Sequence, residues 1–173
     1  AESFNGNISS WDTSSVTTMK EMFMMNSGDV FNQDLNSWDT SSVTDMNGMF
    51  YSTTLFNGNI SSWDVSNVTD MTYMFDGAQD FNQDISGWDT SSVTSMFSMF
   101  DRAMAFNQDL SDWDLGAVLN TIFMFRDSRI SVVNYDNLLG NWEPALLSRG
   151  LSLYKTGFYG GNASFCQASD PGV

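Results

Sequence analysis

The residues of this chain best suited to chemistry are aspartates that recur at a fixed interval. They form two columns: Asp12, Asp39, Asp64, Asp89 and Asp114, and, with amides alternating, Asn7, Asp34, Asn59, Asp84 and Asp109. In a coiled chain such residues stack about 5 Å apart, so ionised carboxylates repel unless something compensates them. We expect backbone amides to compensate the first column, with a calcium ion at Asp39, Asp64 and Asp89 as the alternative.

Catalytic chemistry finds little support in the composition. The chain has no histidine, which removes Ser-His-Asp and Cys-His sites and most zinc sites. Paired carboxylates could serve a glycosidase, but here they recur in every unit, whereas an active site is a single irregular place. We expect no enzyme and no cofactor other than calcium. The single Cys166 is either a small buried hydrophobe or half of a pair whose partner lies outside this sequence.

The aspartates belong to a unit that occurs five times, beginning at Phe4, Phe31, Phe56, Phe81 and Phe106. The tryptophans repeat with it, at Trp11, Trp38, Trp63, Trp88 and Trp113, so the first step is 27 residues and each later step is 25. One unit cannot bury its tryptophan and its Met-Phe pair alone. The units must therefore stack and share one core.

Each unit is expected to contain one short strand and one short helix. In the fourth unit, Ile85 and Trp88 stand among small polar residues, which favours a strand. Val93, Met96 and Met99 have the spacing of one helix face, and the preceding Asp-Thr-Ser-Ser supplies helix caps. The sequence thus predicts an α/β repeat solenoid, leucine-rich-repeat-like, with one short parallel strand plus one short helix per coil.

Three further predictions concern columns of one residue type. The methionines at helical spacing are expected in the core, with Met24 and Met25 as exposed exceptions, and the tryptophans are expected to form a buried stack. The asparagines that follow the first phenylalanine of each unit are expected to form a hydrogen-bond ladder: Asn5, Asn32, Asn57, Asn82 and Asn107.

The chain is expected to be one domain in two parts, a five-coil array over 1–130 and a degenerate last coil with a C-terminal cap over 131–173. Asp136 could cap a last helix that runs to about Trp142, with Pro144 stopping it or starting another turn. Residues 151–173 are expected to form a loop or terminal strand over the open end. The abrupt start at Ala1 suggests a fragment of a longer array.

The net charge of −15, from six basic and 21 acidic residues, excludes several partners. Nucleic acid and anionic membranes both require a surface of lysine and arginine. No run of 18 apolar residues is present, so we expect no insertion into a membrane. Sequons at Asn7, Asn59, Asn67 and Asn162 matter only in a glycosylating host.

The units resemble the repeats of BspA-like leucine-rich-repeat surface proteins of bacteria. The shared pattern is Phe-Asn-x-Asp-Ile/Leu-Ser-x-Trp-Asp-x-Ser-x-Val-Thr-x-Met-x-x-Met-Phe, and it covers about residues 4–130. The resemblance implies an extracellular location at a cell surface. It also implies adhesion to a protein or glycan of a host or a neighbouring cell.

Binding is expected on a regular polar face made of Ser61, Ser86, Ser111, Asp34, Asp84 and Asp109. Two other functions remain open. The array could be a stiff spacer that holds another domain away from the cell. It could also bind ice through Thr13, Thr40 and Thr90 with the serines Ser15, Ser42 and Ser92.

Overall fold

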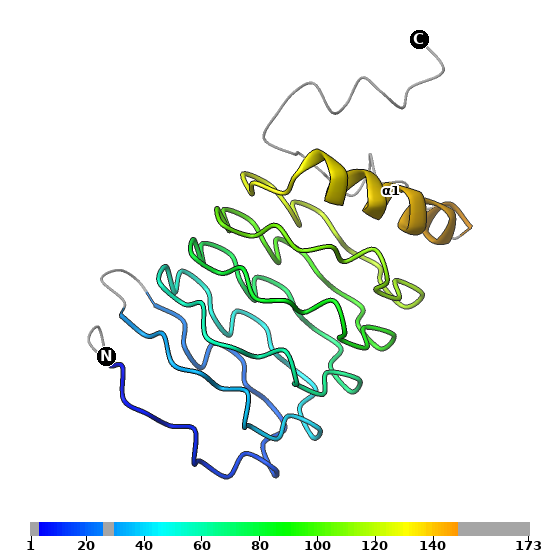
Figure 1. Ribbon diagram of the computed structural model, residues 1–173. Coiled ribbons are helices and arrows are strands. Elements are labelled where there is room, and N and C mark those ends of the chain that lie inside the picture. The colour runs from blue at the N-terminus through cyan, green and yellow to red at the C-terminus, as the bar shows by residue number, and fades with distance from the viewer. Residues whose placement is uncertain (1–3, 26–29, 149–173) are drawn as a thin grey trace.

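The protein is a stack of coils with a helix across one end. The structure is a computed structural model that describes residues 4–25 and 30–148. In this part of the chain the repeats lie one on another around one continuous hydrophobic core, as the period predicts. Helix α1 (Val132–Leu147) lies across the last coil, at the end of the stack opposite the N-terminus (Figure 1).

Columns of aromatic rings run along the core from coil to coil. Phe50, Phe75 and Phe100 stack at centroid distances of 5.6 and 5.5 Å. Beside them, Phe56, Phe81 and Phe106 stack at 5.9 Å in both steps. Within a coil the two columns touch, since Phe75 and Phe81 lie 4.0 Å apart. All six rings are fully buried, and burial of each contributes roughly 1.5–3 kcal/mol.

The tryptophans form a third column and also bond adjacent coils. Each indole Nε1–H donates to a backbone carbonyl of the preceding coil: Trp38 to Ile8 at 3.0 Å, Trp63 to Leu35 at 2.9 Å, Trp88 to Ile60 at 3.3 Å and Trp113 to Ile85 at 3.1 Å. These four rings are buried, which confirms the predicted stack. The exception is Trp11 of the first coil, which is 55% exposed.

The backbone between Met46 and Thr53 shows how coils are joined. Alternate amides donate to the next coil: Met46 to Asp70 O at 3.0 Å, Gly48 to Thr72 O at 2.8 Å, Phe50 to Met74 O at 2.9 Å and Ser52 to Asp76 O at 2.7 Å. The amides between them close local turns, as when Met49 donates to Met46 O at 3.2 Å. Every second amide is therefore hydrogen-bonded to the next coil and cannot make the i→i−4 hydrogen bond of an α-helix.

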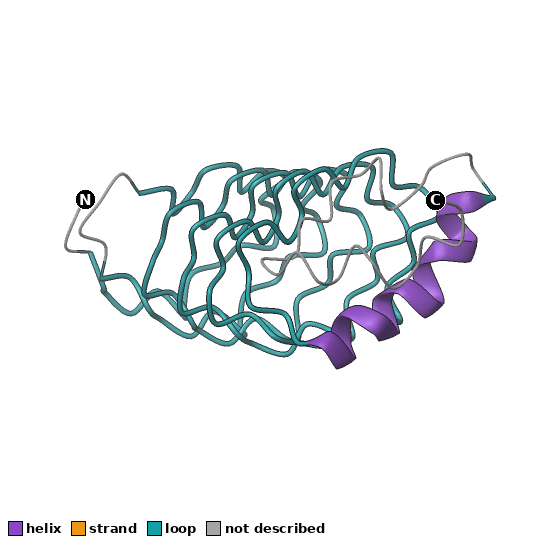
Figure 2. Cartoon of the chain, turned by 90° about the horizontal axis from the view of Figure 1, so that it is seen from above, coloured by secondary structure: helices purple, strands orange, loops and turns teal. Residues whose placement is uncertain are grey.

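The predicted strand and helix in each coil are wrong. Within the described residues α1 is the only helix, and the coils are linked by isolated parallel bridges, Thr18 to Asp45, Asp45 to Asp70, Asp70 to Ser95 and Ser95 to Asn120. Figure 2 shows the coils drawn entirely as loops and turns. The expected strand around Ile85 is a turn in which the Trp88 amide donates to the Ile85 carbonyl at 3.2 Å.

Left-handed residues explain why no helix forms in the coils. One recurs at the same position of each coil, at Glu21, Gly48, Tyr73, Ser98 and Phe123, with φ between 52° and 60°. A second follows four residues later at Ser52, Gly77, Arg102 and Asp127. A positive φ interrupts a right-handed helix. The three-residue spacing of Val93, Met96 and Met99 therefore arises from consecutive turns.

The prediction for the methionines is confirmed in part. Methionines such as Met46 and Met71 are fully buried, but Met22 of the first coil, predicted to lie in the core, is 42% exposed. Of the two expected exceptions, Met24 is 40% exposed and Met25 is half-buried. The asparagine ladder is present, with each side-chain oxygen accepting from the backbone amide of the next asparagine: Asn5 to Asn32 at 3.0 Å, Asn32 to Asn57 at 2.8 Å, Asn57 to Asn82 at 3.0 Å and Asn82 to Asn107 at 2.9 Å.

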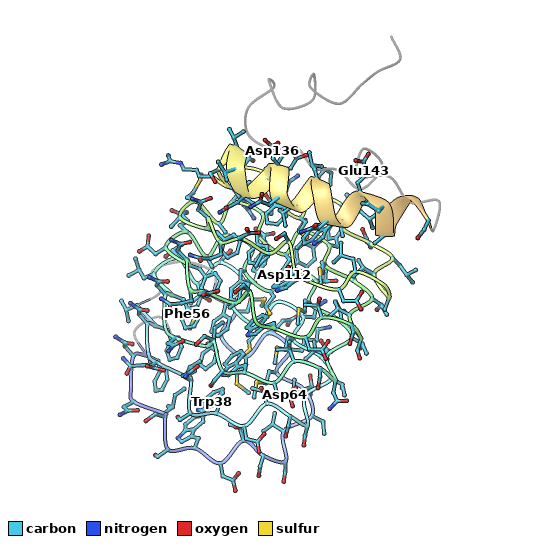
Figure 3. The ribbon with its side chains drawn as sticks, turned by 45° about the vertical axis from the view of Figure 1, so that its right-hand side comes forward. Trp38, Phe56, Asp64, Asp112, Asp136 and Glu143 are labelled. Carbon is cyan, nitrogen blue, oxygen red and sulfur yellow. The ribbon has the colours of Figure 1, made fainter. Side chains whose placement is uncertain are left out.

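Helix α1 seals the last coil. Ser131 caps it by accepting from the Asn134 amide at 3.3 Å, so the helix begins before Asp136 and continues through Pro144, contrary to the predicted bounds. Trp142 and two leucines of α1 join the core, and the Trp142 ring lies 6.5 Å from Phe125. Figure 3 shows Asp136 and Glu143 on the side of α1 that faces away from the coils.

The predictions for 151–173, Cys166 and Asn162 lie outside the described residues. Within the described part of the chain, no helix has the length and apolar character needed to cross a membrane.

The tryptophan column yields a test with a matched control. Trp88→Phe removes the indole donor and leaves a void, so we expect about 2 kcal/mol less stability in urea unfolding. Trp11→Phe makes the same change at a half-exposed indole that makes no hydrogen bond to another coil in the described part of the chain, and should cost about 0.5 kcal/mol or less. Equal losses from the two substitutions would contradict the coil-to-coil role of the indole.

Candidate functional site

The six predicted binding residues lie in one column of turns. Asp84 Oδ1 accepts from the amide of Ser86 at 3.0 Å and from its hydroxyl at 2.7 Å. Equivalent bonds join Asp34 to Asn36 N at 2.8 Å, Asn59 to Ser61 N at 3.0 Å and Asp109 to Ser111 N at 3.0 Å. The three aspartates and Ser61 are exposed, while Ser86 and Ser111 are half-buried. The structure thus brings the predicted residues into register on successive coils.

The first aspartate column makes the same turn. Asp39 Oδ1 accepts from Ser41, and Asp64 Oδ1 accepts from Ser66, through both amide and hydroxyl. Asp89 accepts from the Ser91 amide at 3.0 Å. These bonds lower the pKa of Asp39 and Asp89, the serine hydroxyl contributing most. Repulsion from Asp12 raises the pKa of Asp39 by less.

In the structure, hydrogen bonds from serine amides and hydroxyls therefore compensate the repulsion between the stacked carboxylates. In the described part of the chain no three acidic side chains converge on one point. The expected calcium position at Asp39, Asp64 and Asp89 has one turn-bound carboxylate per coil and no set of converging ligands. Calcium prefers six to eight oxygen ligands.

The threonines proposed as an ice-binding array face inward. Thr13, Thr40 and Thr90 are at most 5% exposed. Their hydroxyls donate to the carbonyls of Asp39, Asp64 and Asp114 in the next coil, at 2.8–2.9 Å. These side chains stabilise the stack and cannot form the proposed surface.

The structure also brings together four aromatic side chains that sequence reasoning missed. Tyr51 meets Tyr73 edge to face at 5.9 Å, Tyr73 meets Phe97 at 5.2 Å, and Phe97 meets Phe123 at 5.9 Å. They come from four consecutive coils and are partly exposed, Tyr73 by 37%. We call these four residues the aromatic strip.

Two ion pairs accompany the aromatic strip. Arg102 donates to Asp76 Oδ1 at 2.6 Å, and Arg126 donates to Asp101 Oδ2. Both guanidinium side chains are more than 40% exposed, whereas both carboxylates are buried. Burial raises the pKa of Asp76 more than Arg102 lowers it. Arg126 also lies 4.5 Å above the Phe123 ring, a cation–π contact.

Two further carboxylates, Asp45 and Asp70, come from the same coils as Tyr51 and Tyr73. Asp70 Oδ2 accepts from the Asn47 side chain at 3.2 Å, and Asp70 precedes Tyr73 by three residues. Asp45 is the equivalent residue one coil earlier and is bridged to Asp70. In the described part of the chain neither carboxylate is in an ion pair.

One feature of the sequence indicates the aromatic strip: at its positions the residue type changes from coil to coil. Tyr51, Asp76, Asp101 and Arg126 occupy one position of successive coils, and Gly48, Tyr73, Ser98 and Phe123 occupy another. Core and turn positions keep their residue types from coil to coil, whereas these do not. Glycine suits the second position, since φ there is positive. The fold therefore does not require aromatic residues at Tyr73 and Phe123.

Comparison with known proteins finds a family. A protein-family model described as Mycoplasma protein of unknown function, DUF285, matches residues 1–63 and 24–142. No curated protein and no solved structure matches the chain. The two matched ranges together include all five repeats and much of α1.

The turn columns yield a test in acid. Hydrogen bonds from Ser86 lower the pKa of Asp84 below its ordinary value of 3.8. Their contribution to stability is therefore present above that pH and is lost as the pH falls through the lowered pKa. Ser86→Ala should therefore cost stability near pH 7, by about 0.5 kcal/mol because the Asp84 carboxylate is exposed, and progressively less as Asp84 becomes protonated in acid.

Ser61→Ala is the control at the same turn position, because Asn59, which accepts from the Ser61 backbone amide, carries no charge. Its effect on urea unfolding should not change with pH over the same range. A loss from Ser86→Ala that persists undiminished in acid would contradict the assignment of the lowered pKa to Ser86.

Proposed function

We propose that this chain, which belongs to the family described as Mycoplasma protein of unknown function, DUF285, is a non-enzymatic binding module of a cell surface. The stack provides a fixed scaffold, and residues on its outside meet the partner. The contrast between repeated and unrepeated positions carries the proposal. Repeated residues build the core and turns, while the aromatic strip and its ion pairs break the repeat and are partly exposed.

The absence of catalysis is part of the proposal and is supported by the state of the carboxylates. A general acid that works at neutral pH needs a raised pKa. The pKa values of Asp84, Asp89 and Asp109 are lowered instead, mainly by hydrogen bonds from serines. Asp76 has a raised pKa, but its carboxylate is buried and paired with Arg102. The sequence also has no histidine.

The location and partner are proposed from the likeness of the units to BspA-like surface proteins. The motif from Phe81 to Phe100 supports this likeness, since it matches their repeat closely. On this proposal the chain is extracellular and adheres to a protein or glycan of a host or a neighbouring cell. The acidic surface excludes partners that carry dense negative charge, because like charges repel.

Two faces compete for the partner. One is the exposed turn column with Asp34, Asp84 and Asp109, joined by Ser61, Ser86 and Ser111. The other is the aromatic strip. Aromatic residues and arginine are the side chains most enriched in the energetic centres of protein interfaces, whereas serine and aspartate are depleted. This composition favours the strip over the turn column.

An array of extracellular-matrix proteins and glycans, probed with the purified chain in calcium and in chelator, tests the proposal. We expect saturable binding to at least one spot, unchanged by chelator. The control variant carries Ser61→Ala, Asp84→Asn and Ser86→Ala together, and should bind as well as the parent. If no protein or glycan on the array binds the chain in either condition, the proposal of a binding module is contradicted and a spacer is favoured.

A further inference from the structure

We infer that the aromatic strip docks an extended segment of a partner protein that carries lysine or arginine side chains. This inference rests on the proposed binding function and adds the chemical class of the partner and its place on the surface.

The geometry of the strip is linear. Its four rings come from successive coils and meet edge to face, with interplanar angles of 83°, 87° and 69°. The strip therefore follows the direction in which the coils stack. An extended chain fits such a line, because its alternate side chains point to the same face at intervals of about 6.8 Å.

The same interplanar angles argue against a sugar chain as the ligand of the strip. A flat platform under several successive sugar rings requires neighbouring aromatic faces that are nearly coplanar. In the strip each ring is turned steeply against the next, so no flat platform extends over two coils. Side chains that insert singly between and above the rings match this surface better.

Charge indicates which side chains those are. Arg102 and Arg126 are already paired with Asp76 and Asp101, so this side of the strip carries little net positive charge. Asp45 and Asp70 make no ion pair within the described residues, and the whole chain carries a charge of −15. This field attracts a cationic segment over a distance of several ångströms.

Aromatic faces bind cations directly. The chain provides an internal example at the end of the strip, where the Arg126 guanidinium lies 4.5 Å from the centroid of Phe123. Tyr73, the most exposed ring of the strip, has no such cation over it in the described part of the chain. A partner's lysine or arginine over Tyr73 would repeat the contact of Arg126 with Phe123.

Tyr73→Gly is the central variant because the fold tolerates it. Gly48 holds the equivalent position one coil earlier with φ of 59°, the same value as Tyr73. Glycine adopts this conformation at no steric cost, so the variant should fold, although it loses the ring contacts to Tyr51 and Phe97. Ser98→Gly makes the same backbone change one coil later, where the side chain is buried, and serves as the matched control.

The probe is a short fluorescein-labelled peptide of alternating lysine and valine, with a glutamate–valine peptide as its counterpart. We expect fluorescence anisotropy to show saturable binding of the lysine peptide alone. Tyr73→Gly should weaken that binding about tenfold, whereas Ser98→Gly should leave it unchanged. Thermal melts of both variants establish that they are folded.

A second arm tests the carboxylates. Asp45→Asn combined with Asp70→Asn keeps the side-chain oxygens that accept from the amides two residues later and removes both charges. It also removes Asp70 Oδ2, the acceptor of the Asn47 side chain, so thermal melts must show that the double variant is folded. We expect weaker binding of the lysine peptide and a smaller dependence of its affinity on salt. Asp84→Asn, in the turn column, removes a charge outside the strip and should have a much smaller effect.

Three outcomes would overturn the inference. One is equal binding of the lysine peptide to Tyr73→Gly and the parent, which would indicate unspecific attraction to an acidic protein. Another is no binding of that peptide to the parent. The third is a neutral glycan from the array whose binding is lost in Tyr73→Gly.

The array of matrix proteins and glycans tests the proposed binding function separately from the role of the strip. If the array binds a ligand and Tyr73→Gly leaves that binding intact, the chain is a binding module but the strip is not its site. If nothing on the array binds the chain, the proposed binding function itself is contradicted.

Discussion

The structure depends on aromatic rings that stack in register from coil to coil. Phe50, Phe75 and Phe100 stack nearly parallel at centroid distances of 5.6 and 5.5 Å, so each ring packs on its counterpart in the next coil. A step of 25 residues between them leaves each coil with the same path. Backbone amides then meet carbonyls of the next coil, and tryptophan indoles meet carbonyls of the previous one. A one-residue slip would break all of these contacts together.

This constraint divides the surface into two kinds of position. Turn residues such as the exposed Asp84 and the half-buried Ser86 are constrained because their hydrogen bonds close the turn. Positions such as that of Tyr73 keep their backbone conformation from coil to coil, but their residue types differ between coils. The first kind gives the array its regularity. The second kind can differ from coil to coil without loss of the stack, which is why we place recognition there.

The core and the ladders could be predicted from sequence, because they depend only on period. The buried tryptophans, the asparagine ladder and the hydrogen-bonded aspartates follow from one residue type recurring at one interval. The local structure could not be predicted. Val93, Met96 and Met99 have a spacing of three, which suits a helix face and equally suits consecutive turns. Only the positive φ at Ser98, which nothing in its residue type requires, decides between them. The strip escaped notice because its rings come from different positions of different coils.

A scan of substitutions at every described surface position, read out both as folded yield and as binding to a cell-surface ligand from the array, would test the central claim most directly. The account predicts that changes in the turn columns lower folded yield, while the protein that does fold binds the ligand as the parent does. Changes at Tyr51, Tyr73 and Phe97 should lower binding while yield is kept. Loss of binding with full yield at Asp34, Asp84 and Asp109, and not at the strip, would contradict the account.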